Sequence, residues 1–283
     1  GENELLSIAF ELEFNFIYVL ASMEQKGIKI DVKLLKEYKD RSLIYLNELT
    51  QNIYEACGES FNINSPKQLG VILFDKLGLA SSKKTKTGYS TDESVLESLK
   101  NEHKVVPLLL KYREAFKLHS TYIEPLLELG LKDSENRVFS SFLHTGTTTG
   151  RLSSKNPNLQ NIPVGAFSDI QIRRAFIAQE GYKLVGVDYS QIELRLLAHF
   201  SQDEALVNAF KQDLDIHLQT AIKIFGEDEA KDKRAIAKTI NFGLLYGMGS
   251  KKLSDTLGIS TKEAKAYIDS YFEAFKSVKD YFK

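Results

Sequence analysis

The segment 231–249, KDKRAIAKTINFGLLYGMG, carries functional side chains at intervals of four residues. These are Arg234, Lys238, Phe242 and Tyr246, and each step of four advances an α-helix by about 400°, so they share one broad face. An arginine forks onto two phosphate oxygens, a lysine adds a point charge, and an aromatic ring stacks on a base. The pattern predicts a nucleoside-triphosphate clamp. On spacing alone, an amphipathic helix with a basic surface and two core aromatics is the stronger alternative.

A second group lies in LVGVDYSQIELRLLAHF, residues 184–200, where an apolar run ends at Asp188. Mg²⁺ prefers one or two carboxylates plus substrate phosphates, so Asp188 and the carbonyl of Tyr189 are candidate metal ligands. The alternatives are that Asp188 caps the next helix and that Glu193 complements its dipole. A triphosphate clamp with a metal carboxylate indicates phosphoryl transfer. A two-metal site needs a second carboxylate, and no other residue of this chain is an obvious one.

The composition is that of a soluble protein with material for a sizeable core. The chain has 283 residues, of which 43% are hydrophobic and 27% charged, and a net charge of -1, which argues against a generic polyanion binder. Positive charge is local, since residues 231–283 carry 11 Lys/Arg and 6 Asp/Glu, although solvated helix faces explain most of it equally well. The single cysteine, Cys57, excludes an intramolecular disulfide and favours a reducing compartment. No signal peptide and no apolar run of about 20 residues is expected, so no membrane is predicted.

The elements that position these residues are mostly helices. The pattern predicts helices over 3–25, from the cap Asp31 to Cys57, after Ser65-Pro66, after a Ser90–Glu93 capping box, and over 106–130. An exposed loop is expected over 81–91, strands over 137–145, 175–178 and 182–190, and an ordered functional loop over 145–163. Further helices are predicted over 191–201, 203–211, 215–225 and 228–246, and from Ser260. This order predicts an α+β fold. Because the chain starts at Gly1 and ends at Lys283 inside a helical pattern, it is expected to be a fragment.

These residues belong to longer motifs that resemble those of a known family. VDYSQIELRLLAHFS (187–201) and KRAIAKTINFGLLYG (233–247) closely resemble the two main motifs of family A DNA polymerases, the bacterial DNA polymerase I type. TTTGRLSSKNPNLQNIPV (147–164) is similar to a third family motif and DIHLQTA (215–221) to a shorter one. FNINSPKQL (61–69) and KYREAFKLHSTY (111–122) extend the likeness over essentially the whole chain.

The resemblance implies a right-hand polymerase architecture, truncated before the second half of the palm. It implies the start of the palm at 1–30, a helical thumb at 31–130, palm at 131–200 and fingers at 201–283. The implied activity is DNA-templated addition of dNTPs to a primer 3′ end with two Mg²⁺ ions. The implied partners are primer–template DNA and dNTPs, bound by a monomer in the bacterial cytoplasm, with activity associated with the nucleoid. The motif with the second catalytic aspartate is expected beyond Lys283, and the exonuclease segments before Gly1.

The resemblance also implies a role for each matched residue. Asp188 matches the catalytic metal-binding aspartate, with Tyr189 beside it, and Glu193 matches a steric gate against the ribose 2′-hydroxyl. Arg234 and Lys238 match the triphosphate-binding pair, and Lys238 is a candidate proton donor to pyrophosphate. The other implied nucleotide contacts are Gln191, His217 (β-phosphate), Phe242 (sugar and base, disfavouring dideoxynucleotides) and Tyr246 (templating pocket). The implied DNA contacts are Arg151, Asn158 and Gln160 near the primer terminus, Arg113 and Lys117 on the thumb, and the thumb tip at 83–89.

Two positions depart from the family pattern, because Gly165 and Ala235 stand where the family often has arginine. The chain alone is expected to be inactive, since the second carboxylate motif is missing. A non-catalytic nucleic-acid-binding fragment is therefore the alternative function. A single-subunit RNA polymerase shares the clamp, but Glu193 argues against it.

Overall fold

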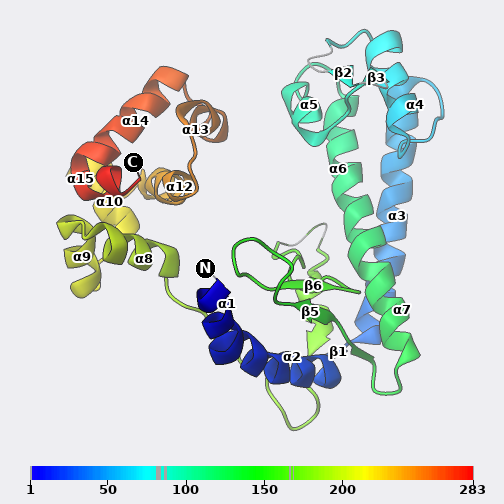
Figure 1. Cartoon of the computed structure of the whole chain (residues 1–283). Coiled ribbons are helices and arrows are strands. Elements are labelled where there is room, and N and C mark those ends of the chain that lie inside the picture. The colour runs from blue at the N-terminus through cyan, green and yellow to red at the C-terminus, as the bar shows by residue number, and fades with distance from the viewer. Residues whose placement is uncertain (1, 81–83, 86–87, 166, 168, 283) are drawn as a thin grey trace. The chain divides into compact units, whose positions relative to one another are not determined.

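The computed structural model describes residues 2–80, 84–85, 88–165, 167 and 169–282. Residue contacts divide the chain into two units, Gly1–Val185 and Gly186–Lys283. Helices dominate both units, and the named strands of the described residues all lie in the first (Figure 1). The α+β class predicted from the order of elements is confirmed. The boundary at 185/186 falls inside the segment 131–200 predicted as palm, and the names of the subdomains stay predictions.

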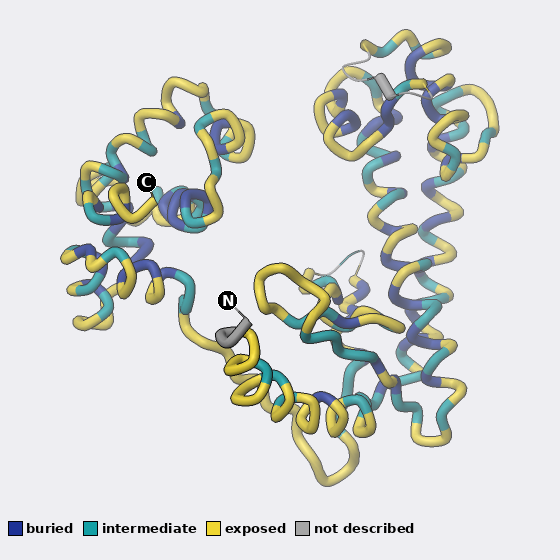
Figure 2. The backbone as a smooth tube through the Cα atoms, viewed as in Figure 1, coloured by how far each residue is buried: buried dark blue, intermediate teal, exposed yellow. Residues whose placement is uncertain are grey.

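The first unit opens with a continuous helical segment that exposes apolar side chains. It comprises α1 (Glu2–Ile8), a π-helical turn η1 (Ala9–Glu13) and α2 (Phe14–Lys26), and Figure 2 shows it as largely exposed. By length and composition alone, Leu5–Lys26 is apolar enough to cross a membrane, so the expectation that no run approaches 20 residues is wrong. One such helix is weak evidence for a membrane, because core helices and signal sequences meet the same criterion.

A long helical hairpin forms most of the first unit. One arm is α3 (Val32–Cys57), and the Asp31 side chain caps it by accepting from the Leu34 N–H at 2.9 Å, as predicted. The other arm runs through α6 (Val105–Lys117), π-helical η3 (Leu118–Ile123) and α7 (Glu124–Lys132), and lies beside α3 along its length (Figure 1). Buried side chains of both arms, including Ile53 and Leu109, form the core between them.

Short elements close one end of the hairpin. Ser65 caps α4 (Pro66–Gly70), which continues into η2 (Val71–Lys76), and β2 (Lys84–Thr85) pairs with β3 (Gly88–Tyr89). The predicted Ser90–Glu93 capping box is wrong, because Ser90 Oγ instead accepts from the Asp92 N–H at 3.3 Å, and α5 (Glu93–Ser98) has no side-chain cap. Residues 81–83 and 86–87 of the expected loop and thumb tip lie outside the described part of the chain.

The sheets of the first unit are small. β1 (Ile28–Ile30) pairs antiparallel with β4 (Arg137–Val138) and β7 (Phe176–Ile177), and β5 (Ser141–Leu143) pairs with β6 (Ser153–Lys155). The 3₁₀ turn η4 (Ile172–Ala175) leads into β7. The strand predicted over 137–145 is therefore two strands in two sheets, and the strand predicted at 175–178 is confirmed. Gly27 turns the chain from α2 into β1 at φ +58°, where a Cβ would approach the Val138 carbonyl to 2.8 Å.

The strand predicted over 182–190 is wrong. The segment has no regular structure and is exposed along its length (Figure 2). Val185 and Val187 are 82% and 93% exposed. A strand is stabilised by a neighbouring backbone and by side chains that cover its apolar faces. Among the described residues no ladder pairs with this segment, so its apolar composition alone does not order it.

The second unit is entirely helical in its described part. Its elements are α8 (Ile192–Ser201), α9 (Glu204–Lys211), α10 (Ile216–Phe225), α11 (Glu227–Ala230), α12 (Arg234–Leu245), α13 (Ser250–Leu257), α14 (Thr261–Ala274) and α15 (Lys276–Tyr281). The helix predicted over 228–246 is divided at 231–233 into α11 and α12. The cap at Ser260 is confirmed, since its Oγ accepts from the Glu263 N–H at 3.1 Å. Tyr271, Phe275 and Val278 are buried at the centre of this unit.

Acid is expected to destabilise the hairpin through His119. Its Nδ1 contacts Ser42 Oγ at 2.8 Å, while Glu124 lies 3.9 Å from its Nε2 and is itself paired with Lys39. Burial lowers the pKa of His119, and Lys39 lowers it further against the opposing effect of Glu124. Below about pH 6.5 the unfolded chain therefore binds more protons than the folded chain. The contribution of neutral His119 to the free energy of unfolding is complete above that pH and is lost as the pH falls.

Urea unfolding of this chain at pH 7.5 and 5.5 measures the effect. His119→Gln is expected to flatten the pH dependence, whereas His199→Gln, at an exposed position, is expected to leave it unchanged. An equally steep dependence in His119→Gln would contradict this assignment.

Candidate nucleotide-binding site

The predicted clamp lies on α12. Arg234 and Lys238 are exposed near its N-terminus, Phe242 is half-buried one turn later, and Tyr246 is the residue after the last helical one, 65% exposed. The opposite face, with Ala237, packs against α10. The helix is therefore amphipathic. The alternative explanation also required two aromatic residues in the core, and Tyr246 is not one. Its ring and the two cations are accessible to a ligand.

A hollow of about 530 Å³ adjoins this face. It lies where α12 ends and turns at Gly247, which adopts φ +72°. Its lining consists of Lys238, Thr239, Phe242, Gly243, Tyr246, Gly247, Met248, Gly249 and Lys252. The hollow is thus lined by two cations, two aromatic rings and a glycine-rich turn with little side-chain bulk. These groups suit a ligand that is anionic at one end and flat at the other.

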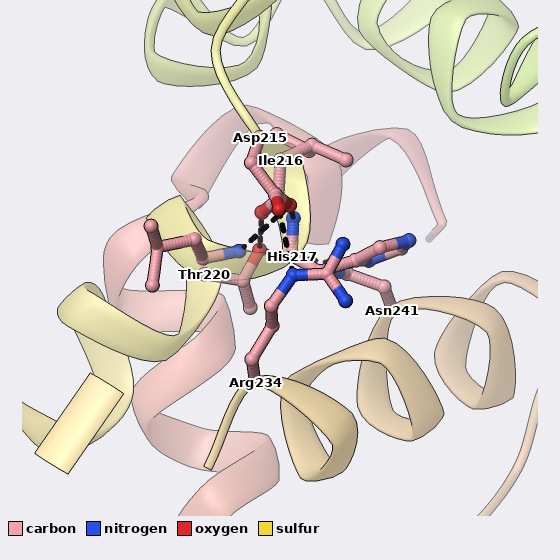
Figure 3. A network of polar contacts seen from close by, with 7 residues as sticks. Asp215, Ile216, His217, Thr220, Arg234 and Asn241 are labelled. Atoms are coloured by element: carbon pink, nitrogen blue, oxygen red, sulfur yellow. Dashed lines mark hydrogen bonds and ion pairs between the residues drawn. The ribbon is translucent and has the colours of Figure 1, made fainter. Parts of the chain in front are cut away.

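Arg234 is held by a carboxylate from another helix. Its Nε donates to Asp215 Oδ2 at 2.6 Å, while Asp215 Oδ1 caps α10 by accepting the backbone N–H of His217 and Leu218 (Figure 3). Burial opposes ionisation of Asp215, but the bonds from Arg234, Leu218 and His217 outweigh it and lower its pKa. Asp215 is therefore a carboxylate at neutral pH and connects the start of α10 to Arg234.

His217 lies beneath Arg234 in a buried polar network. Its Nδ1 is 3.1 Å from Asn241 Nδ2, which also donates to Thr220 Oγ1 at 3.0 Å (Figure 3). An amide nitrogen only donates, so Nδ1 accepts and the ring proton lies on Nε2. Burial lowers the pKa of His217, and Arg234 and Lys238 lower it further against Asp215. The ring is thus neutral at pH 7 and lies 5.6 Å from Phe242, centre to centre.

Asp188 and Tyr189 lie exposed in the irregular segment before α8. The residue preceding α8 is Gln191, at φ +54° and without a side-chain cap, so the alternative that Asp188 caps this helix is wrong. Glu193 lies half-buried in the first turn of α8. The oxygens of Asp188 and Tyr189 match the chemistry of Mg²⁺, but no cluster of three or more potential ligands occurs among the described residues. The role of Asp188 as a metal ligand stays a prediction.

The predicted primer-terminal residues share one loop of the first unit. Asn158 Oδ1 accepts from Ser154 Oγ and from the Gln160 N–H, each at 3.0 Å. Arg151, Asn158 and Gln160 are all exposed. The loop is therefore fixed by its own polar groups, which agrees with the expectation of an ordered loop. The contact of these three residues with DNA stays a prediction.

The two predicted thumb contacts differ. Lys117 is exposed at the end of α6, whereas the guanidinium of Arg113 donates to the carbonyl and hydroxyl oxygens of Thr91. Burial lowers the pKa of Arg113, against Asp92 and Glu93. Arg113 thus connects α6 to the segment before α5, and Lys117 is the more accessible of the two cations.

Comparison with known proteins identifies the family. The sequence model described as DNA polymerase family A matches residues 32–283. The chain belongs to DNA polymerase family A. It is 53% identical over 281 residues to "DNA polymerase I" of Helicobacter pylori strain J99, covering 99% of this chain and 31% of the relative. The corresponding protein of Bacillus subtilis strain 168 is 49% identical over 283 residues, covering 99% and 32%.

A solved polymerase structure has the same fold. It is the "POL domain of Pol1 from M. smegmatis complex with DNA primer-template and dNTP", with a TM-score of 0.87 and 38% identity, covering 98% of this chain and 49% of that one. The resemblance of this family A chain to the bacterial DNA polymerase I type is therefore confirmed, as is the right-hand polymerase fold class. The chain spans about a third of the length of the curated relatives it matches.

Sequence reasoning missed two residues of this site. Asp215 reads as an ordinary helix cap, since aspartate before a helix is a preferred capping residue. Asn241 reads as a polar residue between the apolar Ile240 and the aromatic Phe242. The one available signal is their sequence proximity to residues with predicted roles, two residues before His217 and one before Phe242.

Proposed function

We propose that the protein containing this chain is a DNA-templated DNA polymerase that adds dNTPs to a primer 3′ end. The observation that carries the proposal is the face of α12, where Lys238, Phe242 and Tyr246 line one hollow and Arg234 lies exposed one turn before Lys238. Family membership supports it, and so does a structural relative described in complex with primer-template DNA and dNTP. In this proposal the activity belongs to the whole protein, and this chain alone is inactive.

The residues act mainly by positioning and by neutralising charge, as phosphoryl transfer requires. The terminal nitrogens of Arg234 and the ammonium of Lys238 bind the triphosphate, and the Nε2–H of His217 donates to a phosphate oxygen. Phe242 stacks near the incoming sugar and base, while Tyr246 lines the templating side. Gln191 contacts the nucleotide, and Lys238 protonates the pyrophosphate as it leaves. Arg113, Lys117, Arg151, Asn158 and Gln160 bind the primer–template.

The proposed cofactor is Mg²⁺, with two ions in the complete enzyme. Asp188 and the Tyr189 carbonyl would hold it together with the triphosphate oxygens. When bound, Mg²⁺ would neutralise negative charge on the phosphate and so lower the activation free energy for attack by the 3′-oxygen of the primer. A monomeric state and a cytoplasmic location with nucleoid-associated activity remain predictions.

The second candidate is a non-catalytic nucleic-acid-binding module. The observation that favours it is the absence of a metal-ligand cluster in the described part of the chain. A gel-shift with labelled primer–template and an extension assay with dNTPs and Mg²⁺, on the whole protein, separate the two functions. We expect binding and extension by the whole protein; binding without extension would support the module.

Glu193→Ala in the whole polymerase is expected to relax discrimination against ribonucleotides. The carboxylate of Glu193 is proposed to crowd the 2′ position, so its removal gives the hydroxyl room. Loss of one steric contact of this kind corresponds to roughly 10–200-fold in the ratio of kcat/KM for dNTP and rNTP.

Single-nucleotide incorporation with matched dATP and ATP measures this ratio. Glu204→Ala, which removes an exposed carboxylate from the first turn of α9, is the control and should leave it unchanged. Unchanged discrimination in Glu193→Ala would rule out the gate.

A further inference from the structure

Asp215, to which the family resemblance assigns no role, contacts both the start of α10 and Arg234 of the proposed clamp. Asp215 divides its oxygens between them: Oδ1 accepts the backbone N–H of His217 and Leu218 at 3.0 and 3.1 Å, and Oδ2 accepts Nε of Arg234 at 2.6 Å. The first pair fixes the start of α10, and the second contact connects α10 to the first residue of α12 (Figure 3).

The choice of nitrogen decides what Arg234 can do. A guanidinium presents five N–H donors in a fixed plane, and the two terminal nitrogens form the fork that matches phosphate. The Nε–H is occupied by Asp215, while no hydrogen bond or ion pair of the terminal nitrogens occurs among the described residues. Held at Nε, the plane has a fixed orientation and the fork stays available.

We infer that Asp215 is a positioning residue that orients the Arg234 fork toward the nucleotide triphosphate. The inference rests on the proposed function for its substrate. A ready-made orientation reduces the rotamer freedom that Arg234 loses when the triphosphate binds. Asp215 carries a negative charge that by itself would repel the phosphates. That charge is balanced by Arg234 and by two backbone N–H groups, so the net effect of Asp215 is to increase nucleotide affinity.

The contrary account makes Asp215 a competitor that occupies Arg234 until nucleotide displaces it. The two accounts predict opposite signs. Loss of the charge weakens nucleotide binding if Asp215 positions Arg234, and strengthens it if Asp215 competes. The choice of Nε over the terminal nitrogens favours positioning, since a competitor would occupy the phosphate-binding fork.

The test uses Asp215→Asn in the whole polymerase, because asparagine is an equally good helix cap. Its one oxygen can keep the backbone N–H groups of His217 and Leu218, while its amide nitrogen is a donor and cannot accept from the Nε–H of Arg234. We expect the KM for the templated dNTP to rise about tenfold, with a smaller change in kcat, since a charge-assisted hydrogen bond between partly exposed groups is lost. Asp203→Asn is the matched control: Asp203 caps α9 through Ala205 and Leu206 and also accepts the Ser277 N–H, but has no arginine partner among described residues. It should leave the KM unchanged.

Two further readouts distinguish positioning from simple loss of structure. In the Arg234→Ala background, Asp215→Asn should change the KM by less than about twofold, because residues that act through one contact are not additive. The ¹⁵N NMR signal of the Arg234 Nε–H, in the nucleotide-free whole polymerase, should shift in Asp215→Asn and not in Asp203→Asn. This readout needs no catalysis, so it decides the contact even if the whole protein fails to extend primers. An unchanged or lowered KM, a full effect without Arg234, or an unmoved Nε signal would each overturn the inference.

Discussion

Asp188→Ala in the whole polymerase is expected to lower the rate of dNTP incorporation by at least about 1,000-fold, because a metal ligand contributes several kcal/mol of charge stabilisation in the transition state. Asp188 is exposed in the irregular segment before α8, so its replacement leaves no cavity and breaks no buried contact. The loss should therefore appear in the chemical step, with little change in folding. Rapid-quench incorporation of one templated dNTP on a preformed enzyme–DNA complex measures that step.

Asp228→Ala is the matched control for this variant. Asp228 is an exposed aspartate of α11 in the same unit, with no proposed role, and its replacement should leave the rate within about twofold, as surface substitutions usually do. Primer–template affinity should be retained in both variants. Incorporation by Asp188→Ala at the rate of the unmodified protein would exclude Asp188 as a catalytic metal ligand.

Lys238→Ala in the whole polymerase is expected to lower kcat/KM for the templated dNTP by about 100-fold, the usual effect of removing one preorganised group that stabilises developing charge. The side chain is exposed on α12 beside the hollow, and no ion pair of Lys238 with a carboxylate occurs among the described residues. The ammonium is therefore available for the triphosphate. If it also donates the proton to pyrophosphate, kcat falls together with kcat/KM.

Steady-state kinetics for a single templated dNTP, with Lys231→Ala as control, measure the effect. Lys231 is an exposed lysine in the turn before α12, and its loss tests whether charge alone explains the result. Equal losses in both variants would indicate general electrostatic attraction. A loss in Lys238→Ala alone, with kcat/KM restored in part by Lys238→Arg, would support a specific phosphate contact.

The sequence predicted the shared face of α12 because the geometry of that face is local. Residues four apart on a helix share a face whatever the rest of the fold does, so Lys238, Phe242 and Tyr246 line one hollow as expected. Helix caps at Asp31, Ser65 and Ser260 were equally predictable, because each rests on a residue type and a spacing of three. Ser90 differs because its hydroxyl is bonded to the nearer Asp92 N–H.

Features that depend on distant partners were not predictable. The apolar segment before Asp188 has the composition of a buried strand, but composition does not supply the neighbouring backbone that a strand needs. The contact of Asp215 with Arg234 joins residues 19 positions apart on two helices, and only the packing of α10 on α12 brings them together. The buried position of Asn241 beside His217 depends on the same packing.

The proposed function links the roles of the nucleotide-binding residues to one another. If Arg234, Lys238 and His217 bind a triphosphate, the ring of Phe242 lies beside the sugar and base, and Tyr246 faces the template. The DNA contacts proposed for Arg151, Asn158 and Gln160 lie in the other unit, and each can be tested by alanine substitution in a gel-shift. A loss of DNA affinity without loss of dNTP affinity in those variants would separate the two surfaces.

The most direct test of the central claim is incorporation of single nucleotides by the whole protein opposite each of the four template bases, with Mg²⁺ and one dNTP at a time. The proposed function predicts that the primer is extended by one residue with the complementary dNTP, and far more slowly with the other three or with the matching rNTP. Stable binding of the primer–template without template-directed extension would contradict it.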